Sequence, residues 1–274
     1  MIYDYYKPTR LLEATELFRT KQVEGGKPLY FGGGTEIITL FRLQEISLDT
    51  AIDIKAIDAV RIHDMVEGYF AIGAAVTLTE IQTKNQFPLL TEVAKEVADR
   101  TARNKITLGG NICGNIFYRE AVLPLLLSDS LIVTARGKDI NMNLLTSKFN
   151  EKMLLEDGEI FVQAFIEEKY LHAPYIARKK RQQWDTGYPL ITAAALKIDN
   201  HIRLAFSGLC AFPFRSKQME AVLNETGVSD EEKLNRAIAA VPGEILDDVE
   251  GSKEYRLFVL RNLLEEILVS LERV

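Results

Sequence analysis

The sequence has little of the side-chain chemistry that metal sites and disulfide frameworks need. Its only two cysteines, Cys113 and Cys210, lie far apart and form no CxxC pattern, so this chain encodes neither a disulfide framework nor a zinc or iron–sulfur site. Three scattered histidines, His63, His172 and His201, lack acidic or cysteine neighbours at ligand spacing. We therefore expect each histidine to be a surface or loop residue, in a protein suited to a reducing compartment.

Excess positive charge and long apolar runs are also absent. The 274 residues include 33 basic and 39 acidic side chains, a net charge of −6, which disfavours nucleic acid or an anionic membrane surface as the main partner. The N-terminal segment lacks an apolar signal core, and Pro124 and Asp129 interrupt the most apolar later run. With 47% hydrophobic residues, we expect a cytoplasmic, soluble protein of two or three subdomains.

The predicted elements alternate between α and β without a fixed repeat. Thr9 is a candidate N-cap for a helix that ends at Gly25 and Gly26. The basic segment 172–189 predicts an exposed loop or a subdomain junction. The other predicted elements are strands at 28–31, 50–54 and 69–76, short helices from 37 and 79, a helix from Pro88 to Asn104, an apolar helix and strand over 121–135, short strands to about 168, paired strands around Asn200, a helix capped by Ser229 and Glu232, and a leucine-striped C-terminal helix.

Glycine is concentrated in two short stretches, "YFGGGTEI" at 30–37 and "TLGGNICGN" at 107–115. Glycine lets a ligand approach the main chain without meeting a Cβ, and successive N–H groups ahead of a helix favour phosphate oxygens. A single such loop is usually a tight turn at a strand end. Two of them in one domain favour a binding site for a diphosphate, which needs no lysine cluster.

Neither stretch fits the common nucleotide motifs. A Rossmann fingerprint would need glycine where Ile37 or Asn111 stands, and a P-loop starting at Gly109 would need lysine at Asn115. Cys113 lies in the second stretch without a visible base, so we expect it to pack rather than to act as a nucleophile.

Other catalytic chemistry is sparse. No Ser-His-Asp set or carboxylate pair stands out, and the basic run 178–181 is typical of a solvated loop, although such a run can also meet a phosphate or an acidic partner. If the chain is an enzyme, a bound cofactor should therefore carry the chemistry.

Together, "NKITLGGNICGN" and "YFGGGTEI" resemble the FAD-binding medium subunit of the molybdenum hydroxylases, the xanthine dehydrogenase and carbon monoxide dehydrogenase flavoprotein family. The likeness extends over most of residues 1–135 in the family's order and includes "YYKPTRLLEATELF", "IGAAVTLTEI" and "LPLLLSDSLIV". "FPFRSK" at 212–217 resembles the family's C-terminal domain more weakly.

The resemblance implies an α+β protein with a vanillyl-alcohol-oxidase-like FAD-binding domain at 1–170, made of subdomains at about 1–55 and 56–170. A smaller C-terminal α+β domain would follow at 171–274. Leu108 would lie against the isoalloxazine ring. The cofactor-binding residues that the resemblance implies are Phe31, Gly32, Gly33, Gly34, Thr35 and Glu36 in the first loop, Thr107, Leu108, Gly109, Gly110 and Asn111 in the second, and Glu120 and Asp185 beyond them.

Several positions depart from the family's pattern. Glu120 stands where the family places a cofactor-contacting aspartate, and Asp185 fits a second aspartate. Ala177 falls on a family lysine, for which Arg178 could substitute. The segment "CGNIFYR" is bulkier than usual, so Tyr118 could reshape access to the ring.

The resemblance also implies an oxidoreductase subunit with partners. A molybdopterin-binding subunit would oxidise the substrate, a 2Fe-2S subunit would carry the electrons, and FAD in this chain would pass them to NAD or another acceptor, in an assembly such as a dimer of heterotrimers. Two alternatives stay open: a stand-alone FAD-dependent reductase of the same fold, and a non-catalytic nucleotide-binding protein.

Overall fold

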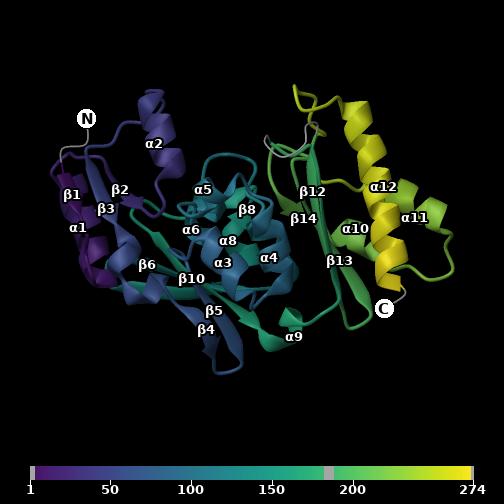
Figure 1. Cartoon of the computed structure of the whole chain (residues 1–274), viewed down its shortest axis with the longest axis horizontal. Coiled ribbons are helices and arrows are strands. Elements are labelled where there is room, and N and C mark those ends of the chain that lie inside the picture. The colour runs from purple at the N-terminus through teal and green to yellow at the C-terminus, as the bar shows by residue number, and fades with distance from the viewer. Residues whose placement is uncertain (1–3, 182–187, 273–274) are drawn as a thin grey trace.

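The computed structural model describes residues 4–181 and 188–272. Its first unit is a small parallel sheet of order β1-β3-β2, in which Phe31 pairs with Asp53. Helix α2 begins directly after the glycine loop that follows β2 (Figure 1). The elements of this unit are β1 (Asp4–Tyr6), α1 (Leu11–Val23), β2 (Pro28–Phe31), α2 (Thr35–Arg42) and β3 (Thr50–Asp53).

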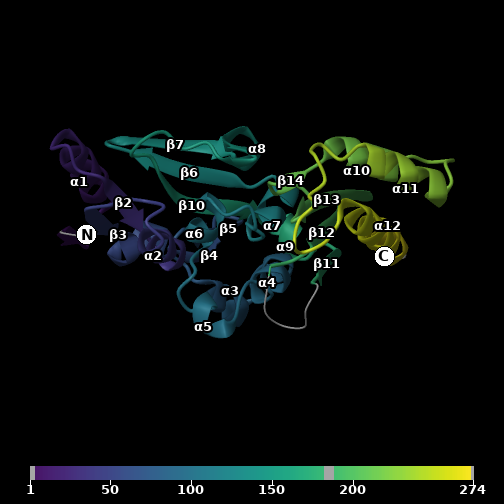
Figure 2. The same cartoon turned by 90° about the horizontal axis from the view of Figure 1, so that it is seen from above.

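The second unit is an antiparallel sheet of order β4-β5-β10-β6-β7 with helices gathered on one side, as Figure 2 shows. Its strands are β4 (His63–Val66), β5 (Tyr69–Gly73), β6 (Leu131–Arg136), β7 (Asp139–Leu144) and β10 (Ile160–Glu167). Its helices are η1 (Ile54–Ala56), η2 (Asp58–Val60), α3 (Leu78–Lys84), α4 (Pro88–Lys95), α5 (Arg100–Arg103), α6 (Leu108–Cys113), α7 (Val122–Leu127), α8 (Leu145–Lys148) and α9 (Glu168–Leu171), and β8 (Phe149–Asn150) pairs with β9 (Lys152–Met153).

Two helix predictions in these units were wrong in detail. The helix predicted from Pro88 to Asn104 is divided into α4 and α5, because Ala98 adopts a left-handed conformation with φ +47° that no helix can continue. The N-cap of α1 is Arg10 rather than Thr9, and Arg10 makes no side-chain capping hydrogen bond.

The C-terminal unit is an antiparallel sheet of order β11-β12-β13-β14 with three helices on its outer face (Figures 1 and 2). The predicted strand pair around Asn200 and the cap of Ser229 on the Glu232 amide are confirmed. The segment 172–189 is not simply a loop, because its residues 175–180 form β11. The elements are β11 (Tyr175–Lys180), β12 (Ile191–Ile198), β13 (His201–Ser207), β14 (Phe214–Arg215), α10 (Lys217–Leu223), α11 (Asp230–Ala239) and α12 (Lys253–Glu272).

Alternate side chains of β12 belong to two different hydrophobic cores. Ala193 and Ala195 pack with α10, α11 and α12, whereas Ala194 and Leu196 join the core of the second unit. Helix α7 lies against β12 and β13 on that side. The predicted mixed α+β fold with a smaller C-terminal unit is confirmed, and the interface along α7 joins the second unit to the C-terminal sheet. In the described part of the chain, no helix is both long and apolar enough to cross a bilayer.

Candidate functional site

The first glycine loop joins the end of β2 to the start of α2. Gly34 is the N-cap of α2 at φ +74°, and a Cβ built there would lie 2.0 Å from the Phe31 ring, so only glycine fits. No side chain caps the helix. The first N–H groups of a helix have no partner within it, and the helix dipole adds positive potential there. The start of α2 can therefore bind anionic oxygens.

The second loop is held by its own chain. Thr107 Oγ1 accepts a 3.1 Å hydrogen bond from the Gly110 amide, and the amides of Leu108 and Gly109 each donate at 2.8 Å to the carbonyls that follow β5. The amide of Asn111 donates to Thr107 O. Because these four donors are occupied, the free amide donors of the site come from the first loop.

The two loops touch. A Cβ on Gly33 would lie 1.7 Å from the carbonyl oxygen of Lys105, and one on Gly32 would lie 2.8 Å from Thr107 Oγ1. The backbones approach more closely than any Cβ permits, which explains why glycine stands at both positions. The loops that the sequence separates by more than seventy residues thus form one continuous main-chain surface.

Lys55 stabilises the first loop, a role that sequence reasoning missed. Its Nζ donates at 2.8 Å to Gly32 O, lies 2.8 Å from Asp53 Oδ1 and stands 5.0 Å from the centre of the Phe31 ring. Burial acts to raise the pKa of Asp53, but hydrogen bonds from Lys55 and Tyr5 hold this pKa below its usual value. The hydrogen bond from Tyr5 to Asp53, together with burial, raises the pKa of Tyr5 to about 12. At physiological pH, Asp53 is therefore ionised and Tyr5 is neutral.

Glu36 connects the start of α2 to the segment after α6. Its Oε1 accepts a 2.7 Å hydrogen bond from the Asn115 amide, and a Cβ on Gly114 would lie 2.3 Å from Oε2. Thr35, beside it, is half-buried, with its carbonyl accepting from Thr39 Oγ1. The first loop therefore contacts both ends of the second glycine stretch.

Three other predicted cofactor residues are buried within the protein. Leu108 is fully buried in the hydrophobic core rather than presented to a cleft, so the expected contact with a ring finds no exposed surface. Asn111 Oδ1 accepts a 3.0 Å bond from the Ala121 amide. Glu120 forms a buried ion pair at 2.8 Å with Lys179. Asp185 lies outside the described residues.

Lys179, which the sequence analysis passed over, is the cation beside Glu120. It also donates to Glu96 O at 2.5 Å. Ala177 carries no charge, and Arg178 pairs with Glu266 of α12 at 2.6 Å on the other face of β11, so Arg178 does not substitute for the family lysine at this place. Alternation along a strand sends neighbouring side chains to opposite faces, a signal that would have separated these residues.

Tyr118 and Tyr188 stack across the boundary between the second and third units. Their ring centres are 4.5 Å apart with an interplanar angle of 8°. Burial raises the pKa of Tyr118 to about 12, with a further contribution from Asp248. The bulky segment that the sequence analysis noted thus forms an aromatic wall where the C-terminal sheet meets the loop before α7.

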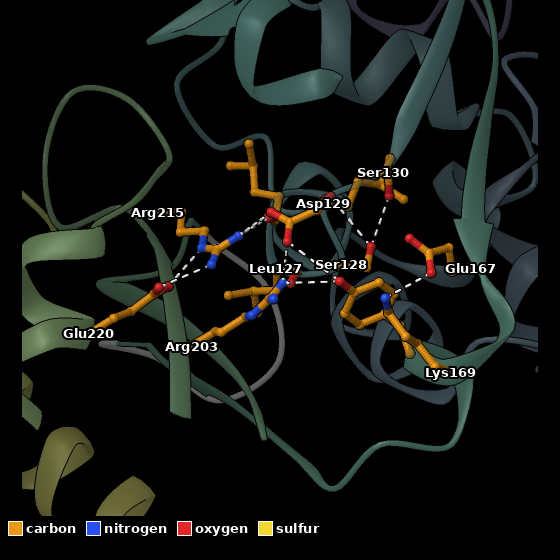
Figure 3. Close-up of polar contacts among 12 residues, drawn as sticks. Leu127, Ser128, Asp129, Ser130, Glu167, Lys169, Arg203, Arg215 and Glu220 are labelled. Atoms are coloured by element: carbon orange, nitrogen blue, oxygen red, sulfur yellow. Dashed lines mark hydrogen bonds and ion pairs between the residues drawn. The ribbon is translucent and has the colours of Figure 1, made fainter. Parts of the chain in front are cut away.

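A polar cluster pins the opposite part of the same boundary (Figure 3). Asp129 accepts 2.6 Å hydrogen bonds from both Arg203 and Arg215. The two guanidinium groups also donate to the last carbonyls of α7, Leu127 O at 2.7 Å and Leu126 O at 2.9 Å. Helix α7 is therefore fixed to the C-terminal sheet at both ends, by this cluster and by the ion pair at Glu120.

Burial shifts the pKa values of Cys113 and His63 in opposite directions. Burial raises the pKa of Cys113 to about 12, which agrees with the expectation that it packs. His63 is buried on β4, and burial lowers its pKa to about 4, so the expectation of a surface residue was wrong for it. Within 4–181 and 188–272, no three histidine, cysteine or carboxylate side chains gather as a metal site requires.

The geometry fits a diphosphate-bearing cofactor. Helix α2 has a glycine N-cap and no side-chain cap, so no Cβ stands between its first amides and a ligand oxygen. A family model described as the FAD binding domain in molybdopterin dehydrogenase matches residues 1–166, and one described as the CO dehydrogenase flavoprotein C-terminal domain matches residues 179–271.

Individual proteins agree with these matches. The xanthine dehydrogenase FAD-binding subunit of Escherichia coli O157:H7 is 22% identical over 96% of this chain and 94% of its own length. The nicotinate dehydrogenase FAD-subunit of Eubacterium barkeri is 23% identical over 81% and 79%. Carbon monoxide dehydrogenase from Hydrogenophaga pseudoflava has the same fold, with a TM-score of 0.88 at 19% identity over 100% of this chain and 98% of its own.

The chain therefore belongs to the family of FAD-binding domains of the molybdopterin dehydrogenases. It is an FAD-binding oxidoreductase subunit of the molybdenum hydroxylase family, as the loops "YFGGGTEI" and "TLGGNICGN" predicted.

Proposed function

We propose that this chain is the electron-transfer subunit of a xanthine dehydrogenase-like complex. The observation that carries the proposal is the contact between the two glycine loops at the uncapped start of α2, which presents main-chain donors to a diphosphate. FAD would supply there the redox chemistry that the described side chains do not offer. The order of units supports domains at 1–170, divided near residue 55, and 171–274.

The residues divide into binding and shaping roles. The segment from Phe31 to Glu36 would bind the diphosphate through the amides of α2, while Thr107, Gly109, Gly110 and Asn111 would close the other side. Leu108 and Asn111 would support the second loop from the core. Tyr118 and Tyr188 would exclude water from one wall of the cleft. Glu120, buried in its ion pair with Lys179, would support the segment before α7, and Asp185 remains the acidic candidate for a contact with the ring.

The partners follow from the family and from the chain's own composition. Relatives are named as FAD subunits or medium chains of dehydrogenases, and the described residues hold no cluster that could bind a metal. Electrons would therefore reach this chain from a separate 2Fe-2S subunit, which receives them from a molybdopterin-binding subunit. NAD is the acceptor that we propose, in an assembly such as a dimer of heterotrimers.

The test is a visible absorbance spectrum of the purified chain before and after FAD, followed by NADH under anaerobic conditions. We expect a flavin spectrum at one FAD per chain that NADH bleaches. If dithionite but not NADH bleached the flavin spectrum, the chain would still be an FAD-binding subunit, but NAD would be rejected as its acceptor.

Two other results would contradict the proposal. If the chain without partners reduced a substrate of its own with NADH, it would be a stand-alone reductase. If it bound nucleotides without flavin, the non-catalytic alternative would hold instead.

A further inference from the structure

Exposed aromatic side chains are concentrated at one place on the C-terminal unit. Five aromatic residues of the described chain are among its exposed large hydrophobic residues, and three of them, Tyr188, Tyr255 and Phe258, lie here with exposed fractions of 52%, 52% and 60%. Val249, at 88%, lies in the turn just before α12. We call these four residues the cleft-side patch. Contiguous exposed apolar residues of this kind mark interaction sites.

The fold holds this patch rigidly. Arg256, which is fully buried, donates to Leu190 O and Gly208 O and forms an ion pair with Asp248. A Cβ on Gly251 would touch the side chains of both Leu190 and Tyr255. The start of α12 is therefore fixed next to Leu190, two residues after Tyr188.

The patch continues onto Tyr118, in the segment that follows the second glycine loop. Tyr188 stacks on Tyr118, and the turn bearing Asp248 and Glu250 lies close enough to affect the charge environment of Tyr118. A partner seated on the patch would cover the aromatic wall of the cleft.

The rim of the patch is acidic. The segment 244–254, which contains Val249 and leads into α12, has five carboxylates against one lysine, Lys253. Asp248 is neutralised by Arg256, whereas the four rim carboxylates have no ion-pair partner among the residues that the structure describes. The rim carboxylates are Glu244, Asp247, Glu250 and Glu254.

We propose that the cleft-side patch is the docking surface for a protein partner whose contact face has an apolar centre and a basic rim. The inference rests on the proposed function, in which a separate subunit exchanges electrons with this chain. Aromatic anchors are enriched at the centres of protein interfaces, and complementary charge accelerates and orients association. The acidic rim complements a basic surface on a protein partner.

A second exposed apolar stripe, Ile140, Met142 and Leu144 on the edge strand β7, provides the comparison surface. It lies at the far edge of the other sheet, and nothing in the described part of the chain identifies its occupant. It therefore carries no proposal but serves as a matched control.

The experiment compares hydrogen exchange in the isolated chain with exchange in the iron-containing complex that co-purifies with the tagged chain from its native host. We expect slower exchange of the 246–258 backbone in the complex and unchanged exchange in β7. Protection of β7 with none at 246–258 would overturn the proposal.

Variants then test the chemistry of the surface. Phe258→Ser, and separately Glu250→Lys combined with Glu254→Lys, should each weaken retention of the iron-containing partner about tenfold or more in Kd, and Met142→Ser should not. Flavin content, read from the visible spectrum of the same samples, should stay at one per chain. Loss of flavin in every sample, including the wild-type chain, would instead refute the proposed function, and undiminished partner binding with flavin present would refute the docking surface alone.

Discussion

Replacing Asp129 should weaken the attachment of the C-terminal unit by a measurable amount. The side chain accepts one 2.6 Å bond from Arg203 and one from Arg215, and Arg215 has a second carboxylate partner in Glu220, which accepts at 2.7 Å. Arg203 has no other carboxylate within reach in the described chain and would keep only its bond to Leu127 O and its contact with Tyr170. Most of the loss should therefore fall on Arg203.

The expected magnitude follows from these contacts. A hydrogen bond to a charged group contributes about 1.5–3 kcal/mol, but the Asp129 side chain is 36% exposed, so water would replace part of it. Asp129→Asn keeps one acceptor and tolerates the left-handed φ of +47°, so we expect a loss of about 1–2 kcal/mol. Asp129→Ala removes both acceptors and adds strain at that φ, for a loss of about 3 kcal/mol.

The pH dependence gives a second, independent test. Burial acts to raise the pKa of Asp129, but Arg215 and Arg203 together hold it below its usual value. A carboxyl group with a lowered pKa in the folded state stabilises the fold above its unfolded pKa of about 3.9 and loses that contribution as the pH falls. The difference between wild type and Asp129→Asn should thus be constant from neutral pH down to about pH 5 and shrink below pH 4.

The assay is urea unfolding followed by far-UV circular dichroism at several pH values, with Glu167→Gln as the control. Glu167 pairs at 2.8 Å with Lys169 in the same region (Figure 3), but both side chains are about half exposed, so we expect less than about 0.5 kcal/mol from its loss. A stability of Asp129→Asn equal to that of the control at neutral pH would refute the assignment of this cluster as a clamp on α7.

Three further predictions concern the candidate site. Gly33→Ala should lower the free energy of unfolding by about 3 kcal/mol, because the new Cβ meets the carbonyl oxygen of Lys105. In Gly110→Ala the new Cβ has one close neighbour, a hydroxyl oxygen at 3.0 Å. We expect that variant to keep nearly the same melting temperature and to retain less FAD in the absorbance spectrum. Lys179→Met should destabilise by about 3 kcal/mol because it leaves Glu120 buried and unpaired, and adding Glu120→Gln should recover most of that loss in a double-mutant cycle. Cys113 should resist thiol reagents at pH 8 while folded and react once urea unfolds the chain, since burial raises its pKa to about 12.

Local patterns predicted what local chemistry determines. The glycine loops, the strand before α2 and the hairpin around Asn200 all follow from residues within a few positions of one another. The break at Ala98 was missed because nothing in its neighbours marks a left-handed alanine.

Most of the features that the sequence did not predict are contacts between segments far apart in the chain. The basic run 178–181 looked like a solvated loop, yet Lys179 points inward to Glu120, fifty-nine positions earlier, while Arg178 points outward to α12. Once β11 is known to be a strand, alternation separates the two side chains. The partner of the buried charge, however, follows only from how the second and third units pack.

The cofactor-binding loops and the proposed docking surface differ in how strongly they constrain the amino-acid sequence. A cofactor that is gripped by main chain requires positions such as Gly33 and Gly34 to lack a side chain, and clustered glycines stand out in any sequence. A docking surface requires only that ordinary residues such as Tyr255 and Phe258 stay exposed, and exposure leaves no mark until the helix that carries them is packed. The cofactor-binding loops can therefore be predicted from the sequence, whereas the place where a protein partner would bind follows only from the fold.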